Sequence, residues 1–342
     1  MLRTIKTNWT NLGGDHSLHT PFPAPERIHP GLDEIDPKTF PDYLDEIGLV
    51  GMGGSGFPTS EKIRKAMGAH TLVVNGIECE PGVSIDEAVL LRDCLWVAAG
   101  ANACAKAIGA GKIVLAVRND SAFHAELKER YGEFEIVPFT DKYPAGAEKL
   151  ILKKLTGKMP PPGTRPYQLG YLVQNVATLR AIGRAIVDGI PVVERPLALA
   201  MPSTGFYKNL IAPVGIEVRE LLQLYQLPFD RSLHVIVDSG LMMGREVHPS
   251  NTIEKTTLSI LVIRRDDAWR DERPCIRCGA CNTACPLGLH PFELTERIRK
   301  GKTGSQAYKA QITECFLCGI CSAVCPSDIP LIQVLKRGKA CK

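Results

Sequence analysis

Between residues 45 and 191, short apolar runs alternate with longer segments that have helical spacing. The run 72–74 is typical of a buried strand, the alanine-rich stretch 86–108 predicts helix, and 112–117 is another short strand. A further helix is predicted over 171–189. Strands and helices that alternate in this way predict a layered α/β domain with a largely parallel sheet.

The pattern changes after this domain. Residues 194–265 contain four short apolar strands around one predicted helix, VRELLQLY, which indicates a small α+β module. From residue 270 to 342, two similar halves each open with a cysteine motif, so the tail is an internal repeat. Residues 1–44 are rich in Pro, Gly and His and are expected to be an irregular lead-in. We therefore predict four parts: 1–44, 45–191, 194–265 and 270–342.

A glycine-rich loop, GMGGSGFPT at 51–59, follows the strand-like segment EIGLV and precedes a helix-like segment. Gly51-x-Gly53-x-x-Gly56 matches the dinucleotide fingerprint in form, although a plain turn is an equal alternative. Between a strand and a helix, the backbone amides of such a loop are placed to cradle a phosphate. Lys62, one to two turns into the helix, is placed to pair with a phosphate or a flavin. A solvated helix face is the alternative for this lysine.

Composition narrows the class of protein. Hydrophobic residues make up 44% and charged residues 23%, as in soluble globular proteins, and the net charge of +4 is spread along the chain. A dense basic stripe is missing, which argues against a nucleic-acid binder. The first residues lack the apolar core of a secretion signal, and no run reaches the ~18 apolar residues of a membrane span. We expect a soluble protein, or one that sits on a membrane through partners.

Twelve cysteines are the most informative feature, because eight of them lie in the motif C-x-x-C-x-x-C-x-x-x-C-P, present twice. In this pattern three thiolates bind one 4Fe–4S cubane, and the fourth ligates the other cluster. The predicted ligands of the first cluster are Cys275, Cys278, Cys281 and Cys325. The predicted ligands of the second are Cys315, Cys318, Cys321 and Cys285. Two zinc sites are the alternative, but zinc gives no reason for the repeated three-plus-one spacing.

The remaining cysteines, Cys79, Cys94, Cys104 and Cys341, have no ligand spacing. Cys94 and Cys104 lie in the alanine-rich helical stretch and are expected to fill the core. The protein is thus expected to be an electron-transfer protein with two 4Fe–4S clusters.

Four ordered motifs carry a resemblance to known families. The loop 51–59 with Lys62 resembles the GxGGxGFPT…K flavin loop shared by the C subunit of the Rnf electron-transport complex and the NADH-binding flavoprotein subunit of complex I. NGIECEPG at 75–82, YPAGAEK at 143–149 and QNVAT at 174–178 are similar to three further motifs of both. The two ferredoxin motifs that follow a small α+β module favour the Rnf C subunit.

The resemblance implies an α/β Rossmann-like domain that binds FMN and NADH, a β-grasp ligand-binding module at 194–265, and a helical two-cluster ferredoxin domain. It implies an FMN site, with Phe57 stacked on NADH and Glu78 and Glu80 lining the nicotinamide pocket. The residues expected to hold FMN are Gly51, Gly53, Gly54, Gly56, Lys62, Asn75, Tyr143, Gly146, Asn175 and Thr178. Since few residues precede the glycine loop, the barrel-sandwich domain usual in the family is expected to be absent or vestigial.

The function that follows is an NADH-dependent oxidoreductase subunit, with electrons passing from NADH by FMN and two clusters to a partner, in either direction. Its expected partners are the other subunits of an ion-translocating complex, including membrane subunits, and ferredoxin or a similar redox protein. A soluble corrinoid reductase and a relay subunit that does not bind NADH are the alternatives.

Overall fold

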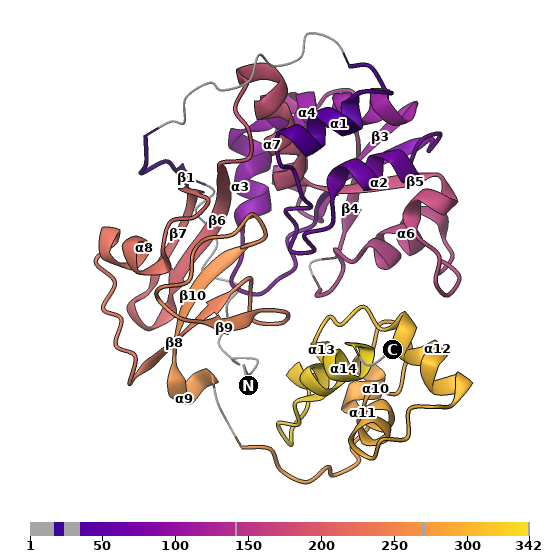
Figure 1. Cartoon of the computed structure of the whole chain (residues 1–342), viewed down its shortest axis with the longest axis vertical. Helices are drawn as coiled ribbons and strands as arrows, with labels where there is room; N and C mark the ends of the chain where they lie inside the picture. The colour runs from indigo at the N-terminus through magenta and orange to yellow at the C-terminus, as the bar shows by residue number, and fades with distance from the viewer. Residues whose placement is uncertain (1–16, 24–34, 141, 269–270, 341–342) are drawn as a thin grey trace.

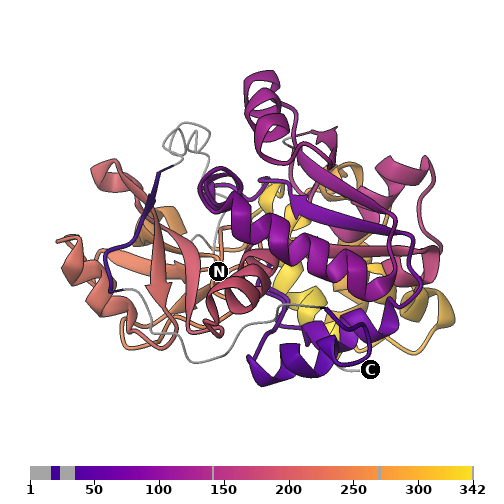
Figure 2. The ribbon, with the colours of Figure 1, turned by 90° about the horizontal axis from the view of Figure 1, so that it is seen from above.

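The computed structural model describes residues 17–23, 35–140, 142–268 and 271–340, and Cys341 lies outside them. Three bodies of structure are visible in Figure 1: an α/β domain, a second sheet with its own helices, and a small helical lobe. Figure 2 shows the two sheet-containing bodies side by side, with the helical lobe under the α/β domain.

The α/β domain is built on a four-stranded sheet in the order β4-β3-β2-β5, with all neighbours parallel. Its strands are β2 (Thr71–Gly76), β3 (Lys112–Arg118), β4 (Glu135–Phe139) and β5 (Tyr171–Asn175). Its helices are α1 (Phe40–Glu46), α2 (Thr59–Lys65), α3 (Ile85–Arg92), α4 (Cys94–Ile108), α5 (Ser121–Arg130), α6 (Glu148–Thr156) and α7 (Val176–Asp188). The predicted parallel α/β arrangement is confirmed.

Alternate side chains of these strands pack on opposite faces of the sheet, as the two-residue strand period requires. Leu72 and Val74 join the core beneath α4 and α7, whereas Val73 faces the smaller core under α6. Strands that are buried on both faces read as continuous apolar runs, which is why β2 and β3 are visible in the sequence. Helices α4 and α7 approach so closely that a Cβ at Gly183 would overlap the carbonyl oxygen of Trp96.

The second body is a six-stranded sheet in the order β1-β7-β6-β10-β8-β9. Its strands are β1 (Leu18–His19), β6 (Glu194–Met201), β7 (Phe206–Pro213), β8 (His234–Asp238), β9 (Arg245–Val247) and β10 (Ser259–Arg264). The hairpin β6–β7 is antiparallel, and β10 runs parallel to β6 in the centre. Helices α8 (Val218–Leu224) and α9 (Arg265–Ala268) cover opposite faces.

The helical lobe repeats one unit twice, as the cysteine motifs predict. It consists of α10 (Ala280–Ala284), α11 (Pro291–Arg299), α12 (Gln306–Glu314), α13 (Ile320–Ala323) and α14 (Leu331–Ala340). The backbone follows the repeat: Arg277 and Leu317 have φ of 54° and 60°, and Gly279 and Gly319 have φ of 74° and 82°. Each motif therefore turns twice through left-handed backbone between its first and third cysteines.

Three expectations from the sequence are wrong in detail. The lead-in 1–44 is not wholly irregular, because Leu18 is buried, strand β1 pairs with β7, and α1 begins at Phe40. The predicted helix 171–189 begins only at Val176, since the Asn175 side chain caps it by accepting from the Ala177 amide. The residues before that cap form β5.

The strand-like segment before the glycine loop also belongs to neither sheet, since it forms only an isolated bridge between Val50 and Pro58. The fingerprint's usual preceding strand is thus not found at this position. Among the residues that the structure describes, no single helix is long and apolar enough to cross a membrane; α3 and α4 reach that length and composition only when joined across a 92° bend.

Candidate functional site

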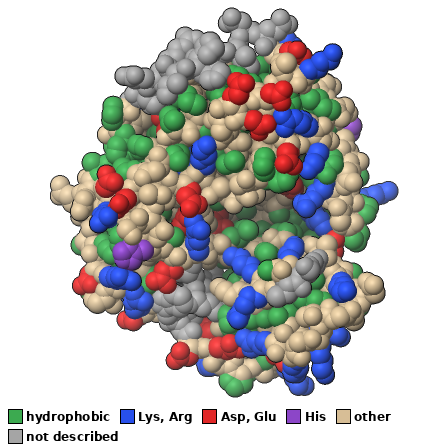
Figure 3. Space-filling model, in the orientation of Figure 1, with side chains coloured by type: hydrophobic (Ala, Val, Ile, Leu, Met, Phe, Trp, Pro, Cys, Tyr) green, Lys and Arg blue, Asp and Glu red, His purple; other side chains and the backbone are tan. Residues whose placement is uncertain are grey.

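A cavity of about 430 Å³ lies between the α/β domain and the helical lobe. Figure 3 shows the surface hollowed where these two bodies meet. The lining includes ten of the predicted FMN and NADH residues: Gly51, Gly53, Lys62, Asn75, Glu78, Glu80, Tyr143, Gly146, Asn175 and Thr178. The fold thus brings together four motifs that are spread over about 130 residues of sequence.

Parallel strands place polar side chains at one edge of the sheet. Asn75 and Asn175 are register partners at the carboxyl ends of β2 and β5, where ligands of open α/β sheets bind. The Asn75 amide donates to the Gly146 carbonyl at 3.0 Å, and the Asn175 amide donates to Asp86 at 2.9 Å. These two bonds join the ends of β2 and β5 to the segments that carry Gly146 and Asp86, and so form one wall of the cavity.

Lys62 lies in the cavity wall, so the interpretation as a solvated helix face is wrong. Its Nζ donates to the Val173 carbonyl and to Glu148, both at 2.6 Å, and its side chain is 24% exposed. The nearby Met52 amide donates to the buried Thr178 hydroxyl at 3.0 Å, which ties the glycine loop to α7. The Lys62 cation is therefore held at the cavity wall by a carbonyl and a carboxylate.

Three carboxyl groups lie half-buried in the same wall. Burial raises the pKa of Glu78 well above its usual range, with the charges of Asp86 and Glu87 adding to the effect. Burial raises the pKa of Glu80 to about 8, although the Met242 amide donates to its carboxylate at 2.7 Å. Burial also raises the pKa of Asp86 to about 6 against the opposing bond from Asn175. The wall can therefore hold protons near neutral pH.

The cavity walls fit a flavin nucleotide on two observations. Gln174 is 3% exposed and lines the cavity, and its Nε2 has no partner among the described residues, so a polar group is ready for a ligand. A Cβ at Gly53 would lie 3.0 Å from the Asn175 Cβ, so only glycine lets the loop pass this close to β5. A buried donor and a close backbone approach are what a polar, planar cofactor requires.

Three predicted residues do not line the cavity: Gly54, Gly56 and Phe57. Gly54 and Gly56 have φ of 90° and 63°, so their role in the structure is to turn the loop. Phe57 is 42% exposed, and the Lys65 ammonium lies 5.3 Å from its ring centroid.

The cavity also has lining residues that sequence reasoning did not select: Asp86, Lys149, Met243 and Phe316. Asp86 has a signal in the sequence, because it opens a predicted helix directly after the NGIECEPG motif. Met243 and Phe316 come from the second sheet's body and the helical lobe, and no local pattern predicts that they reach a site whose other motifs lie within residues 51–178.

The eight motif cysteines lie in two groups, each lining its own cavity. Cys275, Cys278, Cys281 and Cys325 surround about 330 Å³, which is room for a group of several atoms. Cys285, Cys315, Cys318 and Cys321 surround only about 20 Å³, so these thiols must separate to admit a cubane. In the described part of the chain, no three His, Cys, Asp or Glu side chains converge as a single ion would require. In each group, three cysteines of one motif meet the fourth cysteine of the other.

The other cysteines lie apart from these groups. Cys104 is fully buried, and Cys94 is half-buried against the same core, as expected. Cys79 lines the large cavity, where burial raises its pKa to about 12 and the Gly146 amide donates to its sulfur.

The cavity of about 430 Å³ and the second cysteine group share a wall. Cys318 and Phe316 line the large cavity, and the Tyr143 hydroxyl donates to the Cys318 carbonyl at 2.6 Å. Glu314 forms an ion pair with Lys149 and accepts from the Gly163 amide. The second motif is thus held against the α/β domain by charged and neutral hydrogen bonds.

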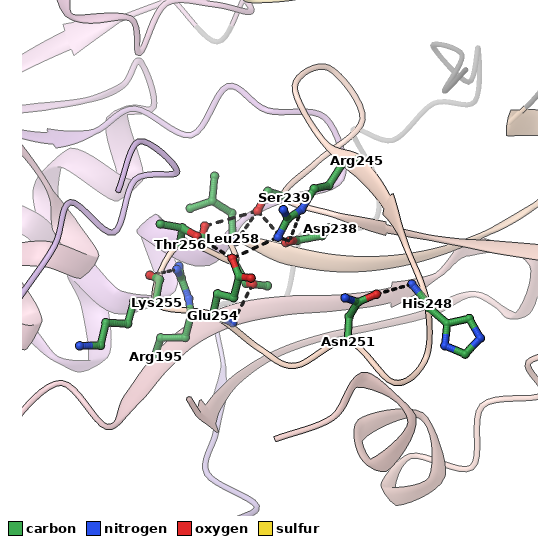
Figure 4. Close-up of polar contacts among 11 residues, drawn as sticks. Arg195, Asp238, Ser239, Arg245, His248, Asn251, Glu254, Lys255, Thr256 and Leu258 are labelled. Carbon is green, nitrogen blue, oxygen red and sulfur yellow. Dashed lines mark hydrogen bonds and ion pairs between the residues drawn. The ribbon is translucent and has the colours of Figure 1, made fainter. Parts of the chain in front are cut away.

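The second sheet supports the site from behind. Arg195, which is completely buried, donates to the Lys255 carbonyl at 2.5 Å and to the Met52 carbonyl of the glycine loop at 3.4 Å. Burial lowers its pKa to about 10. Figure 4 shows Arg195 beside a polar cluster in which Ser239 bonds Asp238 and the Leu258 amide. This body therefore anchors the glycine loop through one buried cation.

A larger cavity, about 650 Å³, lies elsewhere, between the second sheet and helices α4 and α7. Arg180 and Arg184 line it, but both are paired with Glu194, and Arg180 also pairs with Asp93. None of the four sequence motifs contributes to its lining. The cavity of about 430 Å³ is therefore the better candidate for the cofactor.

Comparison with known families agrees with the two parts of the site. Residues 44–184 match the family described as Nuo51 FMN-binding domain, and residues 273–329 match the family described as 4Fe-4S dicluster domain. The first match includes most of the residues that line the cavity of about 430 Å³, and the second includes both cysteine groups.

Curated relatives are named as C subunits of the ion-translocating oxidoreductase complex. The proteins of Edwardsiella ictaluri and Buchnera aphidicola are each 32% identical, over 91% and 90% of this chain. The Rhodobacter capsulatus protein is 32% identical over 92% of it. The chain spans 40%, 67% and 61% of the lengths of these three relatives, respectively.

Solved structures with a similar fold include an NAD+-reducing [NiFe]-hydrogenase, in its air-oxidised and H2-reduced states. The TM-scores are 0.63 and 0.62, at 19% and 17% identity. The alignments cover 95% and 94% of this chain, and 71% and 64% of the hydrogenase chains. The similarity extends over nearly the whole chain, including all three bodies.

Proposed function

Because the chain belongs to the Rnf C family, the C subunits of the ion-translocating oxidoreductase complex, we propose that it transfers electrons between NADH and a partner protein, with FMN and two 4Fe–4S clusters as its cofactors. The observation that carries this proposal is the shared wall: residues of the FMN-binding domain and of the second cysteine motif line one cavity. A nucleotide site and a cluster site placed so close are suited to electron transfer.

The chain's own residues provide for FMN in specific ways. Lys62 supplies a cation to the cavity, Asn75 and Asn175 supply amides at the sheet edge, and the Gln174 amide supplies an unpaired donor among the described residues. FMN, when bound, supplies the conversion between the electron pair of a hydride and the single electrons that 4Fe–4S clusters exchange. Glu78 and Glu80 line the part of the cavity that we assign to NADH, and Phe57, at its outside, is the proposed stacking residue.

The cysteine groups support two clusters with crossed ligation. Each cavity is lined by three thiols of one motif and one of the other, as the two-cluster pattern requires. Because Tyr143 and Glu314 hold the second motif at the large cavity, the site of Cys315, Cys318, Cys321 and Cys285 is the one nearer to FMN in this proposal.

The finer assignments follow from the same proposal. We assign residues 45–191 to a Rossmann-like FMN and NADH domain, 194–265 to a β-grasp module, and 270–342 to a helical ferredoxin domain. The central parallel pair β6 and β10, flanked by the β6–β7 hairpin, supports the β-grasp assignment. The proposed location is the cytoplasmic face of a membrane, in a translocating complex with membrane subunits, and ferredoxin is a proposed redox partner.

Anaerobic purification followed by iron, sulfide and flavin assays tests the cofactors, and a stopped-flow titration with NADH tests the reaction. We expect flavin and cluster absorbance to bleach together. Clusters without flavin, or spectra unchanged by saturating NADH, would leave only a relay subunit. NADH bleaching with transfer to a cobalamin and without co-purifying membrane subunits would instead indicate a corrinoid reductase.

A further inference from the structure

The two cysteine loops of the helical lobe are repeats of each other, yet their surroundings differ. Ile276, Arg277 and Cys278 of the first loop correspond by motif position to Phe316, Leu317 and Cys318 of the second. The backbone of both loops has the same left-handed turns. Any difference in what covers the two loops therefore comes from their neighbours and side chains, not from a different loop shape.

The second loop is covered by the rest of the chain. Phe316 and Cys318 line the cavity of the FMN-binding domain, and Tyr143 donates to the Cys318 carbonyl. At Gly319 the loop packs so tightly on Met242 that a Cβ there would overlap the Met242 carbonyl oxygen. This loop has its redox neighbour within the chain.

The first loop is open. Ile276 is 68% exposed, the ligand Cys278 is exposed, and Val324, next to the ligand Cys325, is 38% exposed. Every residue that lines the cavity of the first cysteine group belongs to the helical lobe itself. The first cysteine group can therefore be reached from outside the lobe, past the exposed Ile276 and the exposed Cys278.

The charge of this surface differs from that of the covered loop. Arg277 stands where the covered loop has Leu317. Arg273, 65% exposed, donates to the Pro326 carbonyl nearby and forms an ion pair with Asp328 at 3.3 Å. Residues 271–342 contain eleven Lys and Arg against six Asp and Glu, whereas the whole chain has a net charge of only +4. Figure 3 shows Lys and Arg side chains gathered on the visible face of this lobe.

We propose that the first-loop rim, formed by Ile276, Arg277, Cys278 and Val324, is the docking surface for a redox protein with an acidic surface. The proposal rests on the proposed function, and it names the kind of partner that the first cluster site meets. The two loops have the same shape. The second loop meets a redox site inside the chain, and we assign to the first loop a redox partner outside it. Ile276 provides the apolar centre of the contact, and Arg277, on a lobe with an excess of Lys and Arg, selects an acidic partner.

The test measures binding, without turnover. An acidic [2Fe–2S] ferredoxin of the plant type is titrated anaerobically into the cluster-loaded protein, and the dissociation constant is measured at low and high salt by calorimetry. We expect binding that weakens as salt rises, because it is charge-steered. Arg277→Glu should weaken it at least tenfold, and Ile276→Ser severalfold. Lys128→Glu, the same charge change on an exposed residue of α5, should leave it within twofold.

Iron content and circular dichroism of each variant show whether the lobe is intact. Absence of ferredoxin binding to the wild-type protein, or equal weakening by Lys128→Glu and Arg277→Glu, would overturn the docking proposal. Ferredoxin affinities of Arg277→Glu and Ile276→Ser equal to that of the wild-type protein would overturn it as well. NADH bleaching of the wild-type protein is measured separately, so a protein that binds ferredoxin at the rim but does not react with NADH rejects the proposed function and leaves the docking surface standing.

Discussion

Replacing Gly53 by alanine tests the close approach of the glycine loop to the sheet edge. The new Cβ would lie 3.0 Å from the Asn175 Cβ and 3.3 Å from its Cγ, which is tighter than ordinary van der Waals contact. Asn175 cannot turn away freely, because it accepts from the Ala177 amide and donates to Asp86, both at 2.9 Å. The loop, the cap of α7 or both must shift.

The expected magnitude is a difference of two effects. Overpacking of this kind costs about 1–3 kcal/mol. Alanine also restricts the unfolded chain, which stabilises the protein by roughly 0.4–1 kcal/mol where the backbone allows it. Gly53 is not in the left-handed region, so both effects apply and the net loss of stability is on the order of 1–2 kcal/mol. If the same shift must be reversed when FMN binds, its dissociation constant rises roughly five- to thirtyfold.

Gly111→Ala is the matched control, because a Cβ there meets nothing within 4 Å and its φ is also outside the left-handed region. Urea unfolding of the flavin-free proteins should show Gly53→Ala destabilised and Gly111→Ala unchanged or slightly stabilised. Fluorescence quenching of added FMN then gives the two affinities. Equal stabilities and equal FMN affinities for the two variants would refute the close-approach reasoning.

Three further predictions concern the carboxyl wall, the helix pair and the joint between domains. Since burial raises the pKa of Glu80 to about 8, its contribution to stability is full below its unfolded pKa and is lost as pH rises through about 8. Urea unfolding between pH 5 and 8 should lose about 1 kcal/mol per pH unit from this group, and Glu80→Gln should remove that slope. Gly183→Ala places a Cβ onto the Trp96 carbonyl oxygen, so thermal unfolding should show a loss of about 3 kcal/mol or more, while an equal melting temperature would contradict the packing of α4 on α7. Tyr143→Phe removes the bond to Cys318, worth about 0.5–1.5 kcal/mol, so amide hydrogen exchange in the second cysteine loop should quicken; unchanged exchange would show that this bond does not hold the joint.

Local chemistry explains which features could be predicted. The apolar runs of β2 and β3 show in the sequence because these strands are buried on both faces, and the cysteine spacing shows because thiols on one loop must surround one group. β1 and β5 were missed for physical reasons. A two-residue strand such as β1 has no period to detect, and β5 leads without a break into α7, where only the Asn175 cap marks the boundary.

Residues of the site divide in the same way. Lys62, Asn75 and Asn175 each belong to a short local motif that can be read from the sequence. The fold then brings the three side chains together in the cavity. Phe57 belongs to the same motif as Lys62, yet its ring lies beside Lys65, after a loop that turns at two left-handed glycines. Motif spacing identifies which residues occur together and does not determine which side of a turn each one faces.

The joint between the three bodies could not be predicted, because many of its contacts involve glycines and backbone groups, which leave no pattern in the sequence. At Gly240 a Cβ would overlap the Glu80 carboxylate, the Met242 amide donates to that carboxylate, and the Met242 carbonyl lies against Gly319 of the second cysteine loop. One short loop of the second sheet's body therefore touches both the carboxyl wall of the large cavity and the second cysteine group. Since backbone contacts of this kind have little freedom to adjust, the loop sets the spacing between the two cofactor sites. This gives the module between the flavin domain and the ferredoxin lobe a positioning role, even without a ligand of its own.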